Sequence, residues 1–519
     1  MAVSNLVGKG AKKSVRIRTW LRITALLMAV WVVCAAAVAE GAALPEESAS
    51  VQAEASDGQP AQVPQEGAPP EGERPPEPPG GEGEPGSLPP QGPDGQPPQA
   101  PGDLPGAPGT VSQGTAATTL ETDTTISGGS FLSQKADENA LRVTNTAQAA
   151  LTGVTIQKLQ GDTSSTENSD FYGQNAGFLA TDGAQAALTV CVSFSPQACA
   201  AQAALTAVSV TTAATGGNAV VSYGEGTAVS VTDSTVSTTG DHSGGIHVTG
   251  GGELTAWNVD VETQGNSSAA IRSDRGGGTL TVEDGSYVTN GTGSPAIYST
   301  AQIAVTNAVL TANRSEAIVL EGRNSVTLTD CTVSGDMQGT YGPDSGENLH
   351  GVMLYQSMSG DAQEGQSLFR MTGGELTTLS GDLFYVTNTD CAIELSGVAL
   401  TLADGCLLRV EGNTGERGWG TPGENGGRCT LNAIAQALSG TIRVDESSSL
   451  DMTLSDGATF EGTVNPEGQG GEVNVTLAQG CRWTLTADAY VTSFTGDLSC
   501  VETNGYTLYT AQEKPVEGV

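Results

Sequence analysis

NAVVSYGEGTAVSVTDSTVSTTG (218–240) is followed by four segments of similar design: GGIHVTGGGELTAWNVDVETQG (244–265), AAIRSDRGGGTLTVEDGSYVTNG (269–291), PAIYSTAQIAVTNAVLTANR (295–314) and EAIVLEGRNSVTLTDCTVSG (316–335). Each contains two short, alternating stretches rich in β-branched residues, separated by Gly, Asp or Asn. The aligned apolar positions Val220, Ile246, Ile271, Ile297 and Ile318 lie 26, 25, 26 and 21 residues apart. A unit of this length cannot bury its own apolar face, so it must stack on its neighbours as a solenoid.

The same spacing continues on both sides of these segments. Aligned apolar positions follow at Val352, Phe384, Leu408, Ile442, Val464 and Val491, and weaker ones precede at Leu141 and Phe178. The longer intervals predict loops inserted at Met337–Asn348, Asp361–Gln366 and Gly412–Arg428. About a dozen coils of this length favour a right-handed parallel β-helix wound from a single chain. Because a solenoid leaves an open edge at each end, we expect caps at residues 115–140 and 504–510.

Composition agrees with an all-β chain. Gly occurs 70 times in 519 residues, aromatic residues make up only 4% and charged residues 15%. Thr, Ser, Val and Gly dominate, which favours strands with tight turns, and no long stretch beyond residue 40 has helical spacing. We therefore predict a β-helix over residues 111–510 and a disordered tail at 511–519.

The N-terminus has the pattern of an export signal. Six basic residues precede an apolar run from Ile23 to Val38, and Ala37 and Ala39 stand at the small-residue positions before Glu40. This pattern predicts a cleaved signal peptide at 1–39, with an uncleaved membrane anchor as the alternative. In either case the rest of the chain is exported, to the cell surface or the extracellular medium.

Residues 40–110 form a different kind of polymer. They contain 18 of the 24 prolines, 13 Asp or Glu against one Arg, and no aromatic residue. Burial of so little apolar surface cannot offset the conformational entropy that the chain would lose on ordering. We therefore expect a disordered, semi-extended linker.

The net charge of −37 restricts the partners. Removal of residues 1–39, which carry six basic and no acidic residues, makes it −43. A nucleic-acid partner is excluded because it requires a basic surface. Membrane contact is expected only through an uncleaved N-terminal segment.

Six stretches resemble secreted bacterial pectin-lyase-like β-helix proteins, a mostly uncharacterised, adhesin-like group. These stretches are SSTENSDFYG (164–173), SDRGGG (273–278), SPAIYST (294–300), LYQSMSGDA (354–362), FYVTNTDC (384–391) and NTGERGWG (413–420). The resemblance covers about residues 120–510. It implies the fold, but little about activity, because β-helices include lyases, hydrolases and adhesins.

Cysteine and histidine patterns give little support for metal or nucleophilic chemistry. Cys191 and Cys199 are candidates for a local disulfide in an exported chain. There is no Cys-x-x-Cys pair, and the three histidines, His242, His247 and His350, belong to no catalytic motif. We interpret these histidines as solvated turn residues.

Strand alternation predicts a ladder of side chains on the outer face of one sheet. If the aligned apolar positions point inward, their neighbours point outward, and coils are about 4.8 Å apart. The outward residues are Arg272, Asp274, Tyr298, Glu321, Tyr355, Tyr385, Arg409 and Glu411, and the inserted loops add Gln356, Arg417 and Trp419 at the border.

This mixture of aromatic and charged side chains suits sugars, because ring faces stack on pyranoses while charged groups bind hydroxyls. We therefore expect a non-catalytic glycan-binding or adhesin-like protein that recognises a glycan or a host or cell-surface ligand. A polysaccharide lyase or hydrolase acting at Arg272 and Asp274 is one alternative. A structural stalk with a solvated ladder is the other. No cofactor is predicted, although turn residues such as Asp233, Asn307 and Asp330 offer oxygens that could bind Ca²⁺.

Overall fold

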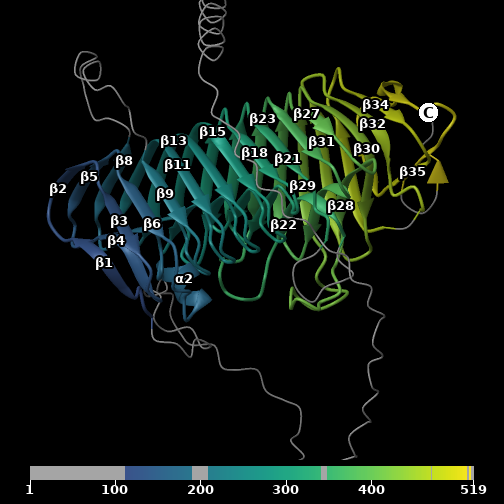
Figure 1. Ribbon diagram of the computed structural model, residues 1–519. Coiled ribbons are helices and arrows are strands. Elements are labelled where there is room, and N and C mark those ends of the chain that lie inside the picture. Colours follow the sequence, from purple (N-terminus) through teal and green to yellow (C-terminus); the bar gives the residue numbers. More distant parts are fainter. Residues whose placement is uncertain (1–110, 190–207, 340–347, 469, 511–513, 516–519) are drawn as a thin grey trace, which may run out of the picture. The chain divides into compact units, whose positions relative to one another are not determined.

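The computed structural model of the protein describes residues 111–189, 208–339, 348–468 and 470–510, and the backbone of 514–515. These residues wind into a parallel β-helix whose coils stack from β1 (Thr115–Leu120) to β37 (Val501–Glu502) (Figure 1). The predicted all-β class and solenoid architecture are confirmed. The predicted signal segment 1–39, the predicted linker 40–110 and the candidate disulfide pair Cys191 and Cys199 lie outside the described residues.

One face of the coils is a 15-stranded sheet, which we name sheet A. Its strands, in spatial order, are β1, β4 (Glu138–Val143), β7 (Phe178–Ala180), β10 (Val220–Tyr223), β12 (Ile246–Thr249), β14 (Ile271–Ser273), β16 (Ile297–Ser299), β19 (Ile318–Glu321), β22 (His350–Tyr355), β25 (Asp382–Thr387), β28 (Cys406–Val410), β30 (Ala437–Val444), β32 (Thr459–Val464), β34 (Arg482–Leu485) and β37.

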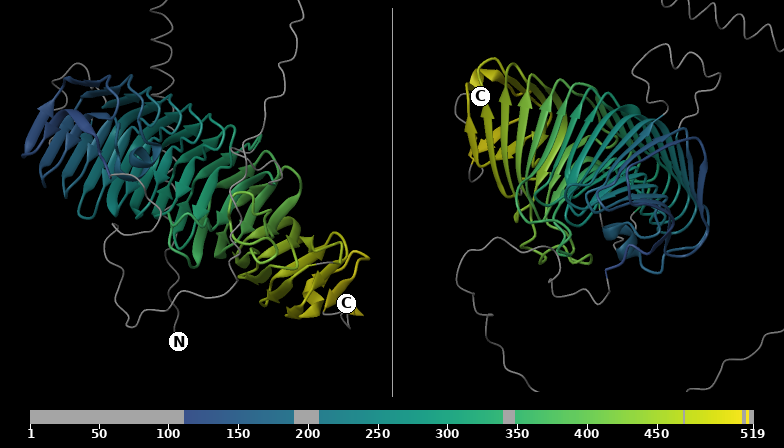
Figure 2. Two further views of the ribbon diagram at one scale, coloured as in Figure 1. Left: turned by 90° about the horizontal axis from the view of Figure 1, so that it is seen from below. Right: turned by 90° about the vertical axis from the view of Figure 1, so that its left-hand side faces the viewer.

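The remaining faces form sheet B, to which most coils contribute two short strands or one long strand. Its strands are β2 (Thr124–Ser127), β3 (Ser130–Ser133), β5 (Gln148–Thr152), β6 (Thr155–Lys158), β8 (Gln185–Thr189), β9 (Ser209–Thr212), β11 (Ala228–Thr238), β13 (Gly252–Thr263), β15 (Gly278–Thr289), β17 (Gln302–Thr306), β18 (Val309–Ala312), β20 (Ser325–Thr329), β21 (Thr332–Gly335), β23 (Ser367–Thr372), β24 (Glu375–Thr378), β26 (Asp390–Ser396), β27 (Ala399–Thr401), β29 (Arg428–Ile434), β31 (Ser449–Ser455), β33 (Glu472–Leu477) and β36 (Ser493–Thr495). A small sheet C contains β35 (Ala489–Val491), β38 (Leu508–Thr510) and β39 (Lys514–Pro515). Seen from one end, strands of successive coils lie behind one another (Figure 2).

The register of sheet A matches the aligned apolar positions of the sequence. Val220 pairs with Ile246, and Ile246 with Ile271. The same column continues through Ile297, Ile318, Val352, Phe384, Leu408, Ile442 and Val464, and begins with Leu141 and Phe178. All of these side chains belong to one buried apolar core that runs along the solenoid, and burial of each contributes roughly 1.5–3 kcal/mol.

The column ends earlier than the sequence predicts. Val491 lies in β35, which pairs with β38 and not with sheet A. The strand that follows β32 in sheet A is β34, in which Trp483 pairs with Phe460. Within the segment 511–519, for which we predict disorder, Lys514–Pro515 forms β39 and pairs antiparallel with β38; the other residues of that segment lie outside the described residues.

The two ends differ from the expected caps. Residues 115–133 form β1 to β3, a coil of their own, in which Thr118 pairs with Leu141. At the other end Leu508 is buried in the core and Tyr509 stacks on Tyr490, with 4.6 Å between ring centroids. Tyr506 is exposed, so only part of the segment 504–510 covers the last coil.

One corner of each central coil adopts the left-handed conformation. Asp233, Asn258, Asp284, Asn307 and Asp330 have φ between 47° and 60°, a region that Asp and Asn tolerate better than other non-glycine residues. The Asn258 amide also donates to the Asp233 carboxylate of the preceding coil at 2.6 Å. Backbone geometry therefore accounts for the turn residues that we had considered as Ca²⁺ ligands.

A short helix that apolar periodicity does not predict lies against sheet A. Helix α2 (Thr166–Tyr172) is capped by Ser165, whose hydroxyl accepts from the Asn168 amide, and ends at Gly173 with φ of 74°. A single 3₁₀ turn, η1 (Leu498–Cys500), follows β36. Within the described ranges, neither helix is long and apolar enough to cross a membrane.

Two of the three predicted inserted loops, Asp361–Gln366 and Gly412–Arg428, fall in described intervals between strands. Sheet strands stop at Gly335, Tyr355 and Val410 and resume at His350, Ser367 and Arg428. The intervals 356–366 and 411–427 each follow a strand of sheet A, β22 and β28. Residues 340–347 of the first interval lie outside the described residues.

Candidate functional site

The outer face of sheet A carries the predicted ladder, but the ladder is covered. Alternation is as expected, since Tyr298, Val319, Met353 and Tyr385 belong to a cluster separate from the core. The exposed fraction is 8% or less for Arg272, Asp274, Glu321, Tyr355, Gln356, Tyr385 and Trp419. The outward ladder that we predicted is therefore not exposed to solvent at these positions, because helix α2 and the loops 356–366 and 411–427 fold over the side chains.

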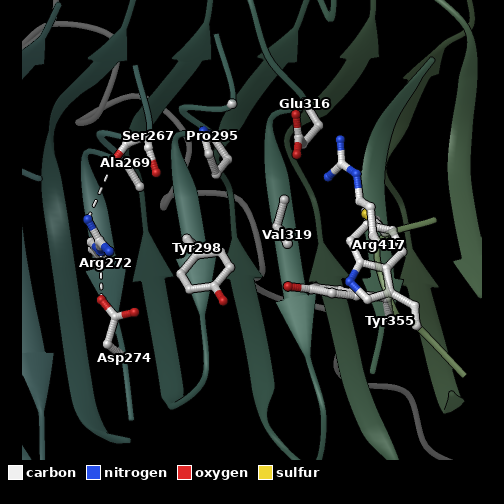
Figure 3. Close-up of a pocket in the computed structure, with 13 residues that line it drawn as sticks. Ser267, Ala269, Arg272, Asp274, Pro295, Tyr298, Glu316, Val319, Tyr355 and Arg417 are labelled. Atoms are coloured by element: carbon white, nitrogen blue, oxygen red, sulfur yellow. Dashed lines mark hydrogen bonds and ion pairs between the residues drawn. The ribbon is translucent and has the colours of Figure 1, made fainter. Parts of the chain in front are cut away.

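A pocket of about 230 Å³ opens on the outer face of sheet A beside the 411–427 loop (Figure 3). Six predicted site residues line it: Arg272, Asp274, Tyr298, Tyr355, Arg417 and Trp419. The remaining lining residues are Ser267, Ala269, Gly293, Pro295, Glu316, Val319 and Met353. Four consecutive strands of sheet A, β14, β16, β19 and β22, supply the floor, and the 411–427 loop supplies one wall.

A ladder of serines positions the chain before these strands. The Oγ atoms of Ser243, Ser268 and Ser294 each accept a backbone N–H from the preceding coil, at 2.9–3.0 Å. All three side chains are fully buried. These bonds fix the turns that present Ser267, Ala269 and Pro295 to the pocket.

Arg272 is the centre of a buried charge cluster. Its Nε lies 2.6 Å from Oδ2 of Asp274, and its Nη2 lies 2.9 Å from Oδ2 of Asp170 in helix α2. His247 Nε2 lies 3.0 Å from the same Asp274 oxygen. Burial lowers the pKa of Arg272, but the two carboxylates more than offset this and raise it. Burial raises the pKa of Asp274, yet Arg272 and His247 reverse that effect and hold it below its usual value.

Glu321 has no cationic partner within the described residues but is fully hydrogen-bonded. Its Oε2 accepts from the hydroxyls of Tyr298 and Tyr355, each at 2.8 Å. Its Oε1 accepts from the hydroxyl of Ser357 and, at 3.3 Å, from the Ser357 amide. Burial raises the pKa of Glu321 and these donors partly oppose the shift. Burial also raises the pKa of both tyrosines well above 10, so both phenols stay protonated.

The 411–427 loop brings an aromatic ring and a cation to the wall. The Trp419 ring packs against Tyr355, with centroids 4.7 Å apart, and the Arg417 guanidinium lies 5.0 Å from the Trp419 ring centroid. Figure 3 shows Arg417 facing the carboxylate of Glu316 across the mouth of the pocket. The side-chain amide of Asn425 holds the loop by donating to Trp419 O at 3.0 Å.

The other predicted residues do not join this pocket. Gln356 lines a neighbouring polar depression on the far side of the 411–427 loop. Arg409 is paired with Asp382 and Glu411 and lines a third depression. Tyr385 packs on His350, with ring centroids 5.2 Å apart. The continuous ladder that we predicted is thus divided into separate sites.

The interpretation of the histidines as solvated is wrong for two of the three. His247 and His350 are fully buried on the outer face of sheet A, under α2 and the inserted loops, and burial lowers the pKa of His350. His242, in contrast, is half-buried in a turn with φ of 53°.

Sequence reasoning missed two site residues, Asp170 and Glu316. Asp170 lies in α2, which the sequence signals through the N-cap Ser165, Glu167 in the first turn and the C-terminal Gly173. Glu316 immediately precedes an aligned repeat strand, β19, at a turn that alternation rules do not cover. Within the described segments, no group of three or more His, Cys, Asp or Glu side chains is arranged to hold a metal ion.

Comparison with known proteins finds no matching family model, no matching curated protein and no matching solved structure. The resemblance to pectin-lyase-like proteins therefore stays a prediction, and the function has to be argued from the chemistry of the pocket.

Proposed function

We propose that this is an exported, non-catalytic glycan-binding protein, adhesin-like in character, whose pocket on sheet A holds a single sugar unit. The observation that carries the proposal is the lining: the rings of Tyr298, Tyr355 and Trp419 lie beside the charged groups of Arg272 and Glu316. Ring faces pack on the apolar face of a pyranose, while charged groups bind its hydroxyls.

The size of the pocket limits the occupant. Its 230 Å³ is below the roughly 300–1,000 Å³ typical of pockets for drug-sized ligands. A terminal or branching sugar fits this volume better than a polysaccharide running through a long groove. Export through residues 1–39 and the spacer at 40–110 complete the proposal, since they would hold the pocket away from the cell that secretes the protein.

A hydrolase is the second candidate, because two carboxylates, Asp274 and Glu316, line the same pocket. Against it, Asp274 is paired with both Arg272 and His247, which leaves it poorly placed to exchange a proton. A lyase that uses Arg272 as its base is disfavoured further, because two carboxylates raise the pKa of that guanidinium. A purely structural stalk would not need the pocket.

The test is a glycan array probed with the full chain and two variants, Trp419→Ala and Trp257→Ala. Trp257 is the matched control because it is exposed on sheet B, away from the pocket. We expect Trp419→Ala to lose binding at least tenfold while Trp257→Ala retains it. Binding that both variants keep would place the ligand elsewhere. A reducing-end assay on the bound glycans identifies hydrolysis or elimination, either of which would overturn the non-catalytic proposal.

A further inference from the structure

The hydroxyls of Tyr298 and Tyr355 have a fixed direction of hydrogen bonding. An ionised carboxylate only accepts hydrogen bonds, and a phenol has a single proton. Both phenols lie 2.8 Å from the same oxygen of Glu321, whose other oxygen is occupied by Ser357. Four donors around one buried carboxyl group are the arrangement that satisfies its ionised form. The tyrosines therefore donate to Glu321.

These two hydrogen bonds to Glu321 determine which groups of the tyrosines remain for a ligand. Once each proton points at Glu321, only oxygen lone pairs remain for the pocket. Figure 3 shows the two hydroxyls turned toward each other at the pocket floor. A ligand meets a pair of acceptors there, and such a pair selects hydroxyl or amine hydrogens rather than a carboxylate.

The arginines do not reverse this preference. Arg272 already forms ion pairs with two carboxylates, from Nη2 to Asp170 at 2.9 Å and from Nε to Asp274 at 2.6 Å. Its Nη1 lies 3.4 Å from the carbonyl oxygen of Ser267. Arg417 packs on Trp419 and faces Glu316.

Charge counting leads to the same result. At the pocket and directly behind it, two arginines stand against four carboxyl groups, those of Asp170, Asp274, Glu316 and Glu321. An anionic ligand would enter a net negative, poorly solvated space, where repulsion is weakly screened.

We infer that the pocket recognises an uncharged sugar through its hydroxyl hydrogens and rejects sugars that bear a carboxylate, such as uronic and sialic acids. The inference rests on the proposed glycan binding and adds the substrate class. Glu321, which does not line the pocket, acts as a positioning residue that sets the polarity of both tyrosines.

The first test measures affinity of the full chain for paired ligands that differ only in oxidation at C6, such as galactose and galacturonate or glucose and glucuronate, by calorimetry or ligand-observed NMR. The neutral member of a pair should bind at least tenfold more tightly. Equal or tighter binding of the uronate overturns the inference but leaves glycan binding standing. Absence of binding to every neutral and acidic sugar, on the array as well, overturns both.

The second test is Glu321→Gln. The amide donates to one tyrosine, whose own proton then turns into the pocket, so neutral-sugar affinity should fall and the neutral-to-uronate ratio should shrink about three- to tenfold. Glu316→Gln is the control for charge alone, because it removes a carboxylate from the lining without contacting either tyrosine. It should raise uronate affinity, and it should lower neutral-sugar affinity less than Glu321→Gln does, because both tyrosines still donate to Glu321.

A third variant keeps the inference testable if Glu321→Gln does not fold. Tyr298→Phe deletes one acceptor and leaves Glu321 with three donors, so it should lower affinity for the neutral sugar about three- to tenfold. Unchanged neutral-sugar affinity in both Glu321→Gln and Tyr298→Phe would contradict the inference that the tyrosine oxygens accept hydrogen bonds from the sugar.

Discussion

Arg275 forms an ion pair with Asp361, which lies 86 positions later in the chain, at 2.7 and 3.0 Å. The same guanidinium lies 4.1 Å from the ring centroid of Phe171 in helix α2. Arg275 therefore joins the two segments that cover the outer face of sheet A, the early helix and the later loop 356–366. This part of the cover over sheet A is held together by a contact that spans several coils.

We expect Arg275→Ala to loosen this cover without unfolding the solenoid. The side chains of Arg275 and Asp361 are 26% and 20% exposed, so the loss should be about 1 kcal/mol. Hydrogen exchange should speed up in 166–172 and 356–366 but not in sheet B. The more exposed pair of Arg428 and Asp390 is the control; equal effects from Arg428→Ala would contradict the bridging role.

Removal of Arg272 should be much more costly. Arg272→Ala leaves Asp170 and Asp274 buried without their cation, which typically costs about 3–5 kcal/mol. Denaturant unfolding of Arg272→Ala and of the exposed control Arg482→Ala measures the difference. Adding Asp170→Asn to Arg272→Ala should restore part of the loss, and a loss no larger than that of the control would refute the cluster's importance.

Because of the buried Lys158, we expect the free energy of unfolding to rise in alkaline solution. Its side chain is fully buried, and burial, opposed by Glu138, lowers its pKa from 10.5 to about 8. The unfolded chain therefore binds more protons between these two values, and the free energy of unfolding should increase as pH rises from about 8 to 10.5. Lys158→Met should lack this increase when the two proteins are compared pH by pH. Parallel curves would mean that Lys158 does not titrate there.

Trp483 should be a main determinant of the C-terminal coils. It is fully buried, stacks on Phe460, and donates from Nε1 to the Gly462 carbonyl at 3.1 Å. Trp483→Ala should cost about 3–5 kcal/mol, whereas Trp257→Ala on the surface should change stability by less than about 0.5 kcal/mol. Thermal unfolding of both variants provides the comparison.

Thiol reactivity should differ sharply along the chain. Cys391 and Cys429 are buried register partners in adjacent coils, and the neighbouring thiol together with burial raises the pKa of Cys391 well above 9. Cys500 is half-buried at the C-terminal end. Brief alkylation of the native protein, read by peptide mass spectrometry, should modify Cys500 and spare Cys391; early modification of Cys391 would show that the core opens there.

The sequence predicted those features that depend on a repeating pattern. Register from Leu141 to Val464 follows from side-chain alternation and apolar repetition, and both are visible in the letters of each coil. Alternation also predicted that Arg272 and Tyr298 point outward. It predicted Val491 wrongly, because the pattern does not show that β34 pairs with β32 and that the strand of Val491 pairs with β38.

Burial of the site was beyond this reasoning. Whether Glu321 faces water depends on where helix α2 and the 356–366 loop fold back, and neither segment repeats from coil to coil. Asp170 precedes Arg272 by about a hundred positions, so only the folded chain brings the two together. Repetition predicts the scaffold, while its interruptions create the pocket.

The pocket floor consists of neighbouring strands, each from a separate coil, and this has a consequence for how such a site can diverge. Insertion or deletion of one whole coil preserves the scaffold but moves the two sides of the floor by one strand spacing, about 4.8 Å. The distance between Arg272 and Tyr355 would then increase or decrease in steps of one strand spacing. Related sites should therefore differ in reach by whole steps of this size.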